Sequence, residues 1–292
     1  MMVFEAKLAE LPEGEAKGDV AAIYGEIRAF ARVPFVALIY RHLATRPGVL
    51  PWVWAVLRPG FASGAIPDAA SRFAEAASLP RVTPIRAVTW RMAGLAAVDR
   101  GPIEAVLDAY DRANPINLLV VRLVVRMLSE DVNLSARVPV SVAEGEDRPR
   151  RAARPTIPDL PPLLPASAIP PDVSAKLSTL TQFGQPTAGA VTPSLYRHLA
   201  HWPGFLGLLP DRLIPLVRQG VIGRAVVAYR QAADIECAAL LPSVRLARDT
   251  PGGAATPSSD GIASTLDAFA MLIPEMIAVG RLVHAMLPQE PI

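Results

Sequence analysis

Apolar residues recur at intervals of three and four along most of the chain, which is the spacing of one face of an α-helix. The pattern is clearest at 18–30 (GDVAAIYGEIRAF), 34–44 (PFVALIYRHLA), 68–79, 83–95 and 102–113. Proline and glycine in the triplets RPG and WPG and in the pair NP separate the helical segments, and we expect each to end one helix and begin the next. Alternating apolar and polar residues, which mark a half-buried strand, are nearly absent. The sequence therefore predicts an all-α fold.

Two stretches of the chain occur twice. YRHLATRPGVL at 40–50 returns as YRHLAHWPGFL at 196–206, an offset of 156. Residues 103–128 match residues 262–287 without a gap, and 11 of the 26 positions are identical. A repeat of this length indicates that the chain contains two copies of one helical unit.

Residues 138–171 separate the two copies and hold nine prolines, which remove backbone donors and are not tolerated in helix interiors. We predict helical repeats at 1–137 and 172–292, joined by this Pro-rich linker. Neither repeat could bury its apolar faces alone, so the expected architecture is a pseudo-dimer packed about an approximate two-fold axis. A pseudo-axis of this kind usually creates a cleft, which is where we expect a binding site.

Composition narrows the function classes. Hydrophobic residues make up 51% of the chain and charged residues 19%, as in a well-buried globular protein. A net charge of +2 provides no basic stripe for nucleic acid. The most apolar stretch, 117–128, is interrupted by Arg122 and Arg126, so no membrane partner is expected.

The N-terminal residues lack the apolar run of a secretory signal. Cys237 is the single cysteine, which excludes an internal disulfide and favours a cytoplasmic location. Cys237 lies in a helical apolar pattern, so we expect it to be buried. His198 and His201 are three residues apart, but no nearby carboxylate or cysteine completes a metal site. Motifs for nucleotide cofactors and serine hydrolases are absent.

Three blocks of the sequence carry a resemblance to a known family: RVPFVALIYRHLATRPGVLPWVWAVLRP, ANPINLLVVRL and LAHWPGFL. They resemble the group I 2-haloacid dehalogenases, which act on both D- and L-enantiomers. The resemblance implies an all-helical pseudo-dimer that needs no metal or organic cofactor. It also implies direct attack of water on the carbon that bears the halogen, without a covalent ester.

The resemblance places the family's functional residues on this chain with one departure. The family's asparagine before proline falls on Asn114, and the serine that precedes its essential aspartate falls on Ser194. The aspartate position itself is Leu195, and its equivalent in the first copy is Ile39. An aliphatic side chain cannot activate water, so the hydrolytic step loses its general base. Phe35 stands where family members carry a tryptophan, and we expect Phe35, Leu38 and Leu195 to contact substrate.

Other polar residues have competing interpretations. His198 shares a helical stripe with Ser194 and could replace the base, although the first copy keeps the same histidine as His42, which favours a packing role. Arg122 and Arg281 repeat, as do Asp108 and Asp267. Either arginine could bind a substrate carboxylate. A structural ion pair between a repeated arginine and a repeated aspartate is an equally good interpretation.

Three functions remain open. The first is a divergent dehalogenase-like enzyme, related to aziridine- or azabicycle-forming proteins of secondary metabolism, in which a substrate amine expels sulfate or halide. Asn114 and Ser194 would then stabilise the departing anion beside His198. The second is a hydrolytic 2-haloacid dehalogenase that uses another base. The third is a non-catalytic binding protein or partner subunit. The expected partners are a small-molecule substrate and either a second copy of the chain or a separate subunit.

Overall fold

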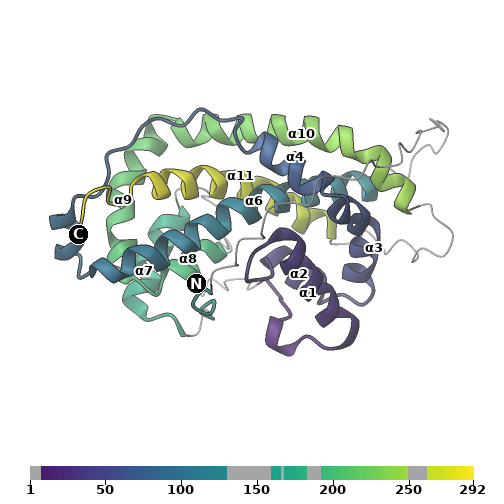
Figure 1. The fold of residues 1–292 in the computed structure, drawn as a ribbon, viewed down its shortest axis with the longest axis horizontal. Coiled ribbons are helices and arrows are strands. Elements are labelled where there is room, and N and C mark those ends of the chain that lie inside the picture. The colour runs from purple at the N-terminus through teal and green to yellow at the C-terminus, as the bar shows by residue number, and fades with distance from the viewer. Residues whose placement is uncertain (1–7, 130–158, 166–167, 183–191, 249–261) are drawn as a thin grey trace, which may run out of the picture.

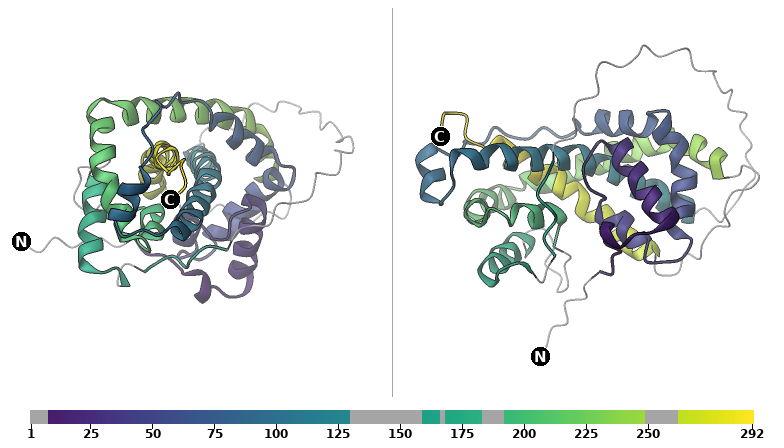
Figure 2. Two further views of the ribbon diagram at one scale, coloured as in Figure 1. Left: turned by 60° about the vertical axis from the view of Figure 1, so that its left-hand side comes forward. Right: turned by 60° about the horizontal axis from the view of Figure 1, so that its bottom comes forward.

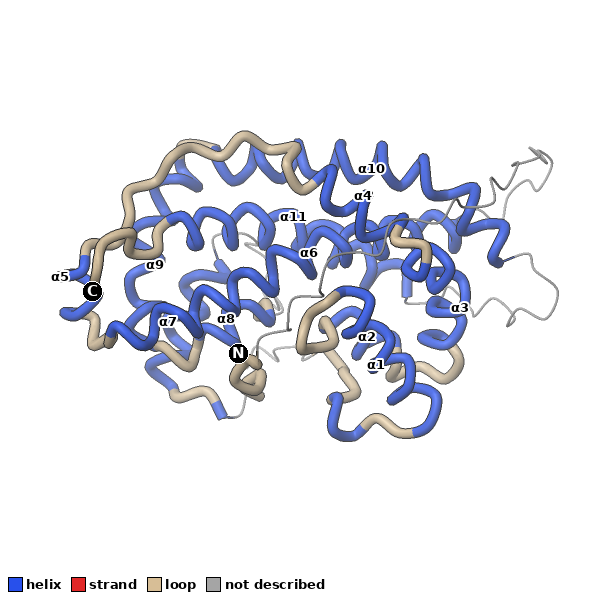
Figure 3. The backbone as a smooth tube through the Cα atoms, in the orientation of Figure 1, coloured by secondary structure: helices blue, strands red, loops and turns tan. Residues whose placement is uncertain are grey.

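The computed structural model describes residues 8–129, 159–165, 168–182, 192–248 and 262–292. Every regular element within these residues is a helix, and the described part contains no strand (Figures 1 and 3). The predicted all-α class is therefore confirmed. The helices are α1 (Gly18–Ala31), α2 (Leu38–Leu43), α3 (Val49–Ala62), α4 (Ala65–Phe73), α5 (Ala87–Met92), α6 (Arg100–Ser129), α7 (Pro171–Gln182), α8 (Ser194–Leu199), α9 (Pro203–Arg218), α10 (Val221–Arg248) and α11 (Ile262–Ala285), with short 3-10 turns at Glu13–Glu15 and Ala97–Asp99.

Most of the predicted linker at 138–171 lies outside the described residues. Its described parts, 159–165 and 168–170, form no α-helix, and Pro171 already begins α7. The domain boundaries at 137 and 172 and the pseudo-dimer of two repeats stay predictions.

Helices α6 and α11 pack against each other along the centre of the molecule, and the other helices surround them (Figure 2). The second half of α6 is apolar over most of its surface, and a helix of that kind is stable only when most of it is covered. Six of its apolar residues have no exposed surface: Leu118, Leu119, Val120, Val121, Leu123 and Val124. The apolar stretch at 117–128 is thus the core of the fold.

The expectation that the NP pair ends a helix is wrong. Pro115 lies inside α6, and the corresponding Pro274 lies inside α11. A proline in a helix interior removes one backbone hydrogen bond and costs about 3 kcal/mol. Burial of the flanking apolar turns of both helices offsets that cost, so packing decides the outcome over local propensity.

The repeated arginines form structural ion pairs. Arg122 of α6 donates to Asp234 of α10, and Arg281 of α11 donates through Nε to Asp111 of α6 at 2.7 Å. The repeated aspartates are not their partners: Asp108 lies 3.1 Å from His284, and Asp267 is exposed. These arginines therefore tie α6, α10 and α11 together.

The short helices α2 and α8, which carry the repeated residues YRHL, contact the two long helices in crossed order. α2 precedes α6 in the sequence but contacts α11, while α8 precedes α11 but contacts α6. Each short helix has six residues and begins at the equivalent position of the repeat, Leu38 in one and Ser194 in the other. The crossed order brings the starts of α2 and α8 to the same part of the α6–α11 pair.

A single carboxylate joins the two short helices. Glu10 accepts from Arg41 of α2 at 2.8 Å, and Nη1 of Arg197 of α8 lies 3.4 Å from its other oxygen. Arg41 is only 4% exposed, so this carboxylate compensates for the burial of its guanidinium. Glu10 thus fixes the positions of α2 and α8 relative to each other.

Gly48 and Gly204 are equivalent positions of the repeated segments 40–50 and 196–206, but each is needed for a different reason. Gly48 precedes α3 with φ of 78°, a left-handed conformation that other residues rarely adopt. Gly204 is in α9, where an added Cβ would lie 2.0 Å from the carbonyl oxygen of Ala93. One glycine permits a turn, whereas the other permits close approach of two backbones.

Cys237 has no exposed surface, which confirms the expected burial. Among the described residues, no single helix has the length and apolar character required to cross a membrane. Helices α3 and α4 would satisfy those criteria only together, as a pair bent by 79°.

Candidate functional site

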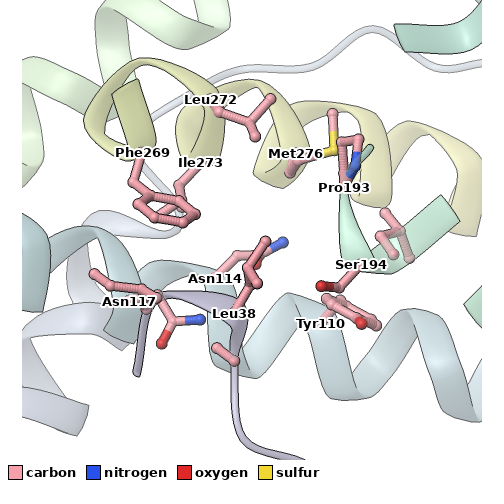
Figure 4. A pocket seen from close by; sticks show the side chains of 13 residues that line it. Leu38, Tyr110, Asn114, Asn117, Pro193, Ser194, Phe269, Leu272, Ile273 and Met276 are labelled. Atoms are coloured by element: carbon pink, nitrogen blue, oxygen red, sulfur yellow. The ribbon is translucent and has the colours of Figure 1, made fainter. Parts of the chain in front are cut away.

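A cavity lies between the starts of α2 and α8 and the middle turns of α6 and α11 (Figure 4). The space open to the centre of a water-sized sphere is about 60 Å³. One water needs roughly 10–15 Å³ of such space, so the cavity has room for a small organic molecule. Its lining residues are Ala37, Leu38, Ile39, Tyr110, Asn114, Asn117, Pro193, Ser194, Leu195, Phe269, Leu272, Ile273 and Met276.

The lining residues occupy corresponding positions of the two repeated segments. The offset of 156 pairs Ala37 with Pro193, Leu38 with Ser194, and Ile39 with Leu195. The offset of 159 pairs Tyr110 with Phe269, Asn114 with Ile273, and Asn117 with Met276. The sequence predicted a cleft between the repeated segments, and this cavity lies between them.

The two long helices line the cavity with opposite polarity. α6 contributes a hydroxyl and two amides, from Tyr110, Asn114 and Asn117, whereas the three equivalent residues of α11 are apolar. Figure 4 shows Asn114 and Asn117 on one side of the cavity and Phe269 and Ile273 on the other. A ligand with one polar and one apolar side therefore has a preferred orientation here.

No described residue that lines the cavity carries a carboxylate, an imidazole or a cationic group. Leu195 lines the wall and is 1% exposed, and Ile39 lines the same cavity at 2% exposure. In the described part of the chain, no three His, Cys, Asp or Glu side chains lie close enough to hold a metal ion. The lining groups that can form hydrogen bonds through their side chains are the hydroxyls of Tyr110 and Ser194 and the two amides.

Glu275 is the carboxylate of α11 that comes nearest in sequence to the lining residues, directly before Met276. It is not itself part of the lining. Burial raises the pKa of Glu275 to about 7. Burial also raises the pKa of Tyr196, and the charge of Glu275 adds to that shift. Glu275 therefore belongs to the packing beside α8 and does not supply the cavity with a base.

The raised pKa of Glu275 predicts a pH-dependent stability. Its folded pKa of about 7 exceeds the ordinary value of 4.5, so ionisation destabilises the fold as pH rises through that window. Glu275→Gln is expected to match wild type below pH 4.5 and to exceed its unfolding free energy by on the order of 1–3 kcal/mol at pH 8. Urea unfolding at both pH values measures this difference. Identical pH profiles for the two proteins would show that the buried carboxyl ionises without cost.

His198 lies behind the cavity wall and does not line it. Its Nδ1 and the Tyr110 hydroxyl are 2.8 Å apart, and the side chain is 2% exposed. Burial lowers the pKa of His198 to about 4, assisted by the positive charges of His201, Arg41 and Arg197 and opposed by a hydrogen bond with the Pro161 carbonyl. His198 is therefore neutral at pH 7, and its Nδ1 is engaged with Tyr110.

The other histidines of the predicted stripe have different partners. Nδ1 of His42 lies 2.8 Å from the Ala9 carbonyl oxygen, and Nε2 of His201 lies 2.8 Å from that of Pro162. Neither lines the cavity. The stripe of Ser194, His198 and His201 therefore does not act as one site.

Four of the six site residues expected from the sequence are assembled at the cavity: Leu38, Asn114, Ser194 and Leu195. Phe35 is one layer further out, with its ring stacked on Tyr110 at a centroid distance of 4.7 Å. Sequence reasoning missed the polar residues Tyr110 and Asn117. Their repeat equivalents are the apolar residues Phe269 and Met276. An alignment of the two repeated segments therefore marks both positions by their difference in polarity.

Comparison with known proteins supports a fold relationship. No family model matches the chain. A configuration-inverting 2-haloacid dehalogenase from Alcaligenes xylosoxydans xylosoxydans is 28% identical over 267 residues, which cover 89% of this chain and 83% of the relative. Solved structures of a D-2-haloacid dehalogenase with L-LA and of its mutant with D-2-CPA superpose with TM-scores of 0.67 at 19% and 18% identity. Both cover 97% of this chain and 94–95% of the solved chain, so the fold is shared over almost its full length.

Proposed function

We propose that this protein is a dehalogenase-like enzyme that expels sulfate or halide from a small amino substrate by attack of the substrate's own amine, without using water. Similarity to a configuration-inverting 2-haloacid dehalogenase supports displacement of an anion from carbon. The observation that carries the non-hydrolytic step is the cavity wall at Leu195, where the described lining residues provide no group able to deprotonate water.

The amine attacks the neighbouring carbon with its lone pair, and the bond from that carbon to the leaving group breaks. The leaving group departs with the bonding electrons as sulfate or halide, and the product is a three-membered ring with a protonated nitrogen. That proton is then lost to solvent. This displacement needs no oxidant, reductant or metal.

Magnitudes favour an internal nucleophile in this cavity. Loss of a positioned general base lowers a rate by about 10²–10⁴, or roughly 3–5 kcal/mol. An internal, correctly oriented nucleophile can lower the barrier by about 7–11 kcal/mol. Because the second effect is larger, a site without a base remains competent when the substrate carries its own amine.

The cavity also favours the reactive form of the amine. Nucleophilic attack requires a neutral nitrogen, and a buried site without a counter-ion disfavours ammonium. The described lining contains no carboxylate that would hold the amine in its charged form. The same lack of a carboxylate thus prevents activation of water and leaves the amine free to react.

The polar wall of α6 provides donors for the departing anion. Asn114 is 8% exposed and Asn117 is 5% exposed, and both amides line the cavity. In the described part of the chain neither amide has a side-chain hydrogen bond to another residue, and both line the wall that a ligand would contact. A developing negative charge gains most from donors that are already oriented before the reaction.

Hydrolysis is the competing function, because the curated relative is a 2-haloacid dehalogenase. Purified protein is incubated with 2-aminoethyl hydrogen sulfate and, separately, with each enantiomer of 2-chloropropionate. We expect sulfate and aziridine from the first substrate and no chloride above the uncatalysed level from the second. Chloride release from 2-chloropropionate with 2-hydroxypropionate as product would support hydrolysis instead, and inertness toward all three would favour a binding role.

A further inference from the structure

The strongest unassigned feature of the cavity is a line of polar groups that begins at Ser194 and leads away from the cavity. Ser194 Oγ is shielded from bulk solvent and has no hydrogen-bond partner of normal geometry in the described part of the chain. It lies beside the hydroxyl of Tyr110, which in turn lies 2.8 Å from His198 Nδ1 (Figure 4). Ser194 is thus the cavity end of this line.

The direction of the hydrogen bonds follows from the histidine. A neutral imidazole has one donor nitrogen and one acceptor nitrogen. The Pro161 carbonyl beside His198 can only accept, which favours the proton on the ring nitrogen that is not engaged with Tyr110. Because Nδ1 is engaged with Tyr110, the donor is Nε2 and Nδ1 accepts. The Tyr110 O–H therefore donates to His198.

Ser194 is left with one role toward the cavity. The proton of Tyr110 is committed to His198, so the tyrosine oxygen can only accept from Ser194. A serine O–H turned toward the neighbouring Tyr110 oxygen would leave the lone pairs of Oγ facing the ligand. Ser194 then acts as an acceptor, which suits an N–H group and opposes an anion.

We propose that Tyr110 and His198 are positioning residues that hold Ser194 as a hydrogen-bond acceptor for the substrate's N–H group. The inference rests on the proposed function, because it identifies the neutral amine as the group that Ser194 recognises. It assigns Ser194 to the amine and leaves the asparagine amides to the leaving anion. The sequence had assigned Ser194 to the anion.

The substrate class that fits is a small primary amine with an anionic leaving group on the next carbon. Its N–H faces Ser194 at the start of α8, its leaving group faces the amides of α6, and its carbon frame faces Phe269 and Met276 of α11. An analogue of the same size in which a methyl replaces the amine would leave the serine acceptor unpaired, which costs affinity.

Two ligands of matched size test this inference: 2-aminoethyl hydrogen sulfate and propyl sulfate. Calorimetric titration near the pKa of the amine gives the affinity ratio for each protein. Wild type is expected to prefer the amine, and Ser194→Ala and Tyr110→Phe to reduce that preference by roughly 3- to 10-fold, the value of one hydrogen bond. Tyr229→Phe removes a buried hydroxyl of α10 outside the cavity and is expected to leave the preference unchanged.

The affinity for propyl sulfate separates positioning from structural damage. Unchanged propyl sulfate binding in Tyr110→Phe shows an intact cavity, whereas an equal loss for both ligands overturns the inference. Wild type without an amine preference also overturns it. An amine preference without ring product would remove the proposed function alone, and ring product together with an unaltered preference in Tyr110→Phe would remove this inference alone.

Discussion

Leu195→Asp is expected to convert the protein into a hydrolytic enzyme, with formation of hydroxy product from 2-chloropropionate rising by about 10²–10⁴ over wild type. Aspartate has the same branched four-atom outline as leucine, so it fits the wall without opening a void. At 1% exposure the new carboxylate is poorly solvated, which raises its pKa and strengthens it as a base. Initial rates of chloride release measure the gain.

Leu195→Asn is the matched control for that substitution. It places an isosteric polar group in the same wall but provides no base, so hydrolysis is expected to stay at the wild-type level. Equal rates in Leu195→Asp and Leu195→Asn would show that this position is not where water is activated. Wild-type hydrolysis as fast as that of Leu195→Asp would show that another base is already present.

Glu10→Ala is expected to lower the free energy of unfolding by about 3–5 kcal/mol, because it leaves the buried Arg41 guanidinium without its counter-ion. Arg41 is 4% exposed and Arg197 shares the same carboxylate. The loss also separates α2 from α8, so the cavity between their starts loses its shape. Urea unfolding monitored by circular dichroism measures the change.

An exposed ion pair provides the control for Glu10. Glu104 lies 3.8 Å from Arg100 one turn away on α6, and both side chains are more than a third exposed. Glu104→Ala is expected to cost less than about 0.5 kcal/mol. Equal losses in Glu10→Ala and Glu104→Ala would contradict the bridging role of Glu10.

The periodic apolar pattern was sufficient to predict the helical class, because each amphipathic stripe must face a core. It could not predict that α6 and α11 run through Pro115 and Pro274, since a local rule for proline ignores the packing of the flanking turns. Nor could it show that α2 contacts α11 while α8 contacts α6. That crossed order depends on long-range packing and on Glu10, which no local pattern connects to Arg41 and Arg197.

The candidate site was predicted in part. Leu38, Ser194 and Leu195 were expected at the site, Ser194 and Leu195 from the family resemblance, and all three line the cavity. His198 is a titratable residue within the repeated segment, yet the structure places it behind Tyr110, with Nδ1 2.8 Å from the tyrosine hydroxyl. Asn117 and Tyr110 were missed because an amide and a phenol on an apolar helix carry no motif. What distinguishes Asn117 and Tyr110 in the sequence is that their repeat equivalents, Met276 and Phe269, are apolar.

The central claim is that the reaction centre excludes water as a nucleophile. The most direct measurement is turnover of 2-aminoethyl hydrogen sulfate in water labelled with ¹⁸O, with the ring nitrogen acylated before mass spectrometry. We predict unlabelled sulfate and a cyclised amine, because the carbon–oxygen bond breaks and no solvent oxygen enters either product. An open-chain amino alcohol that carries ¹⁸O, formed at the rate of sulfate release, would contradict the account.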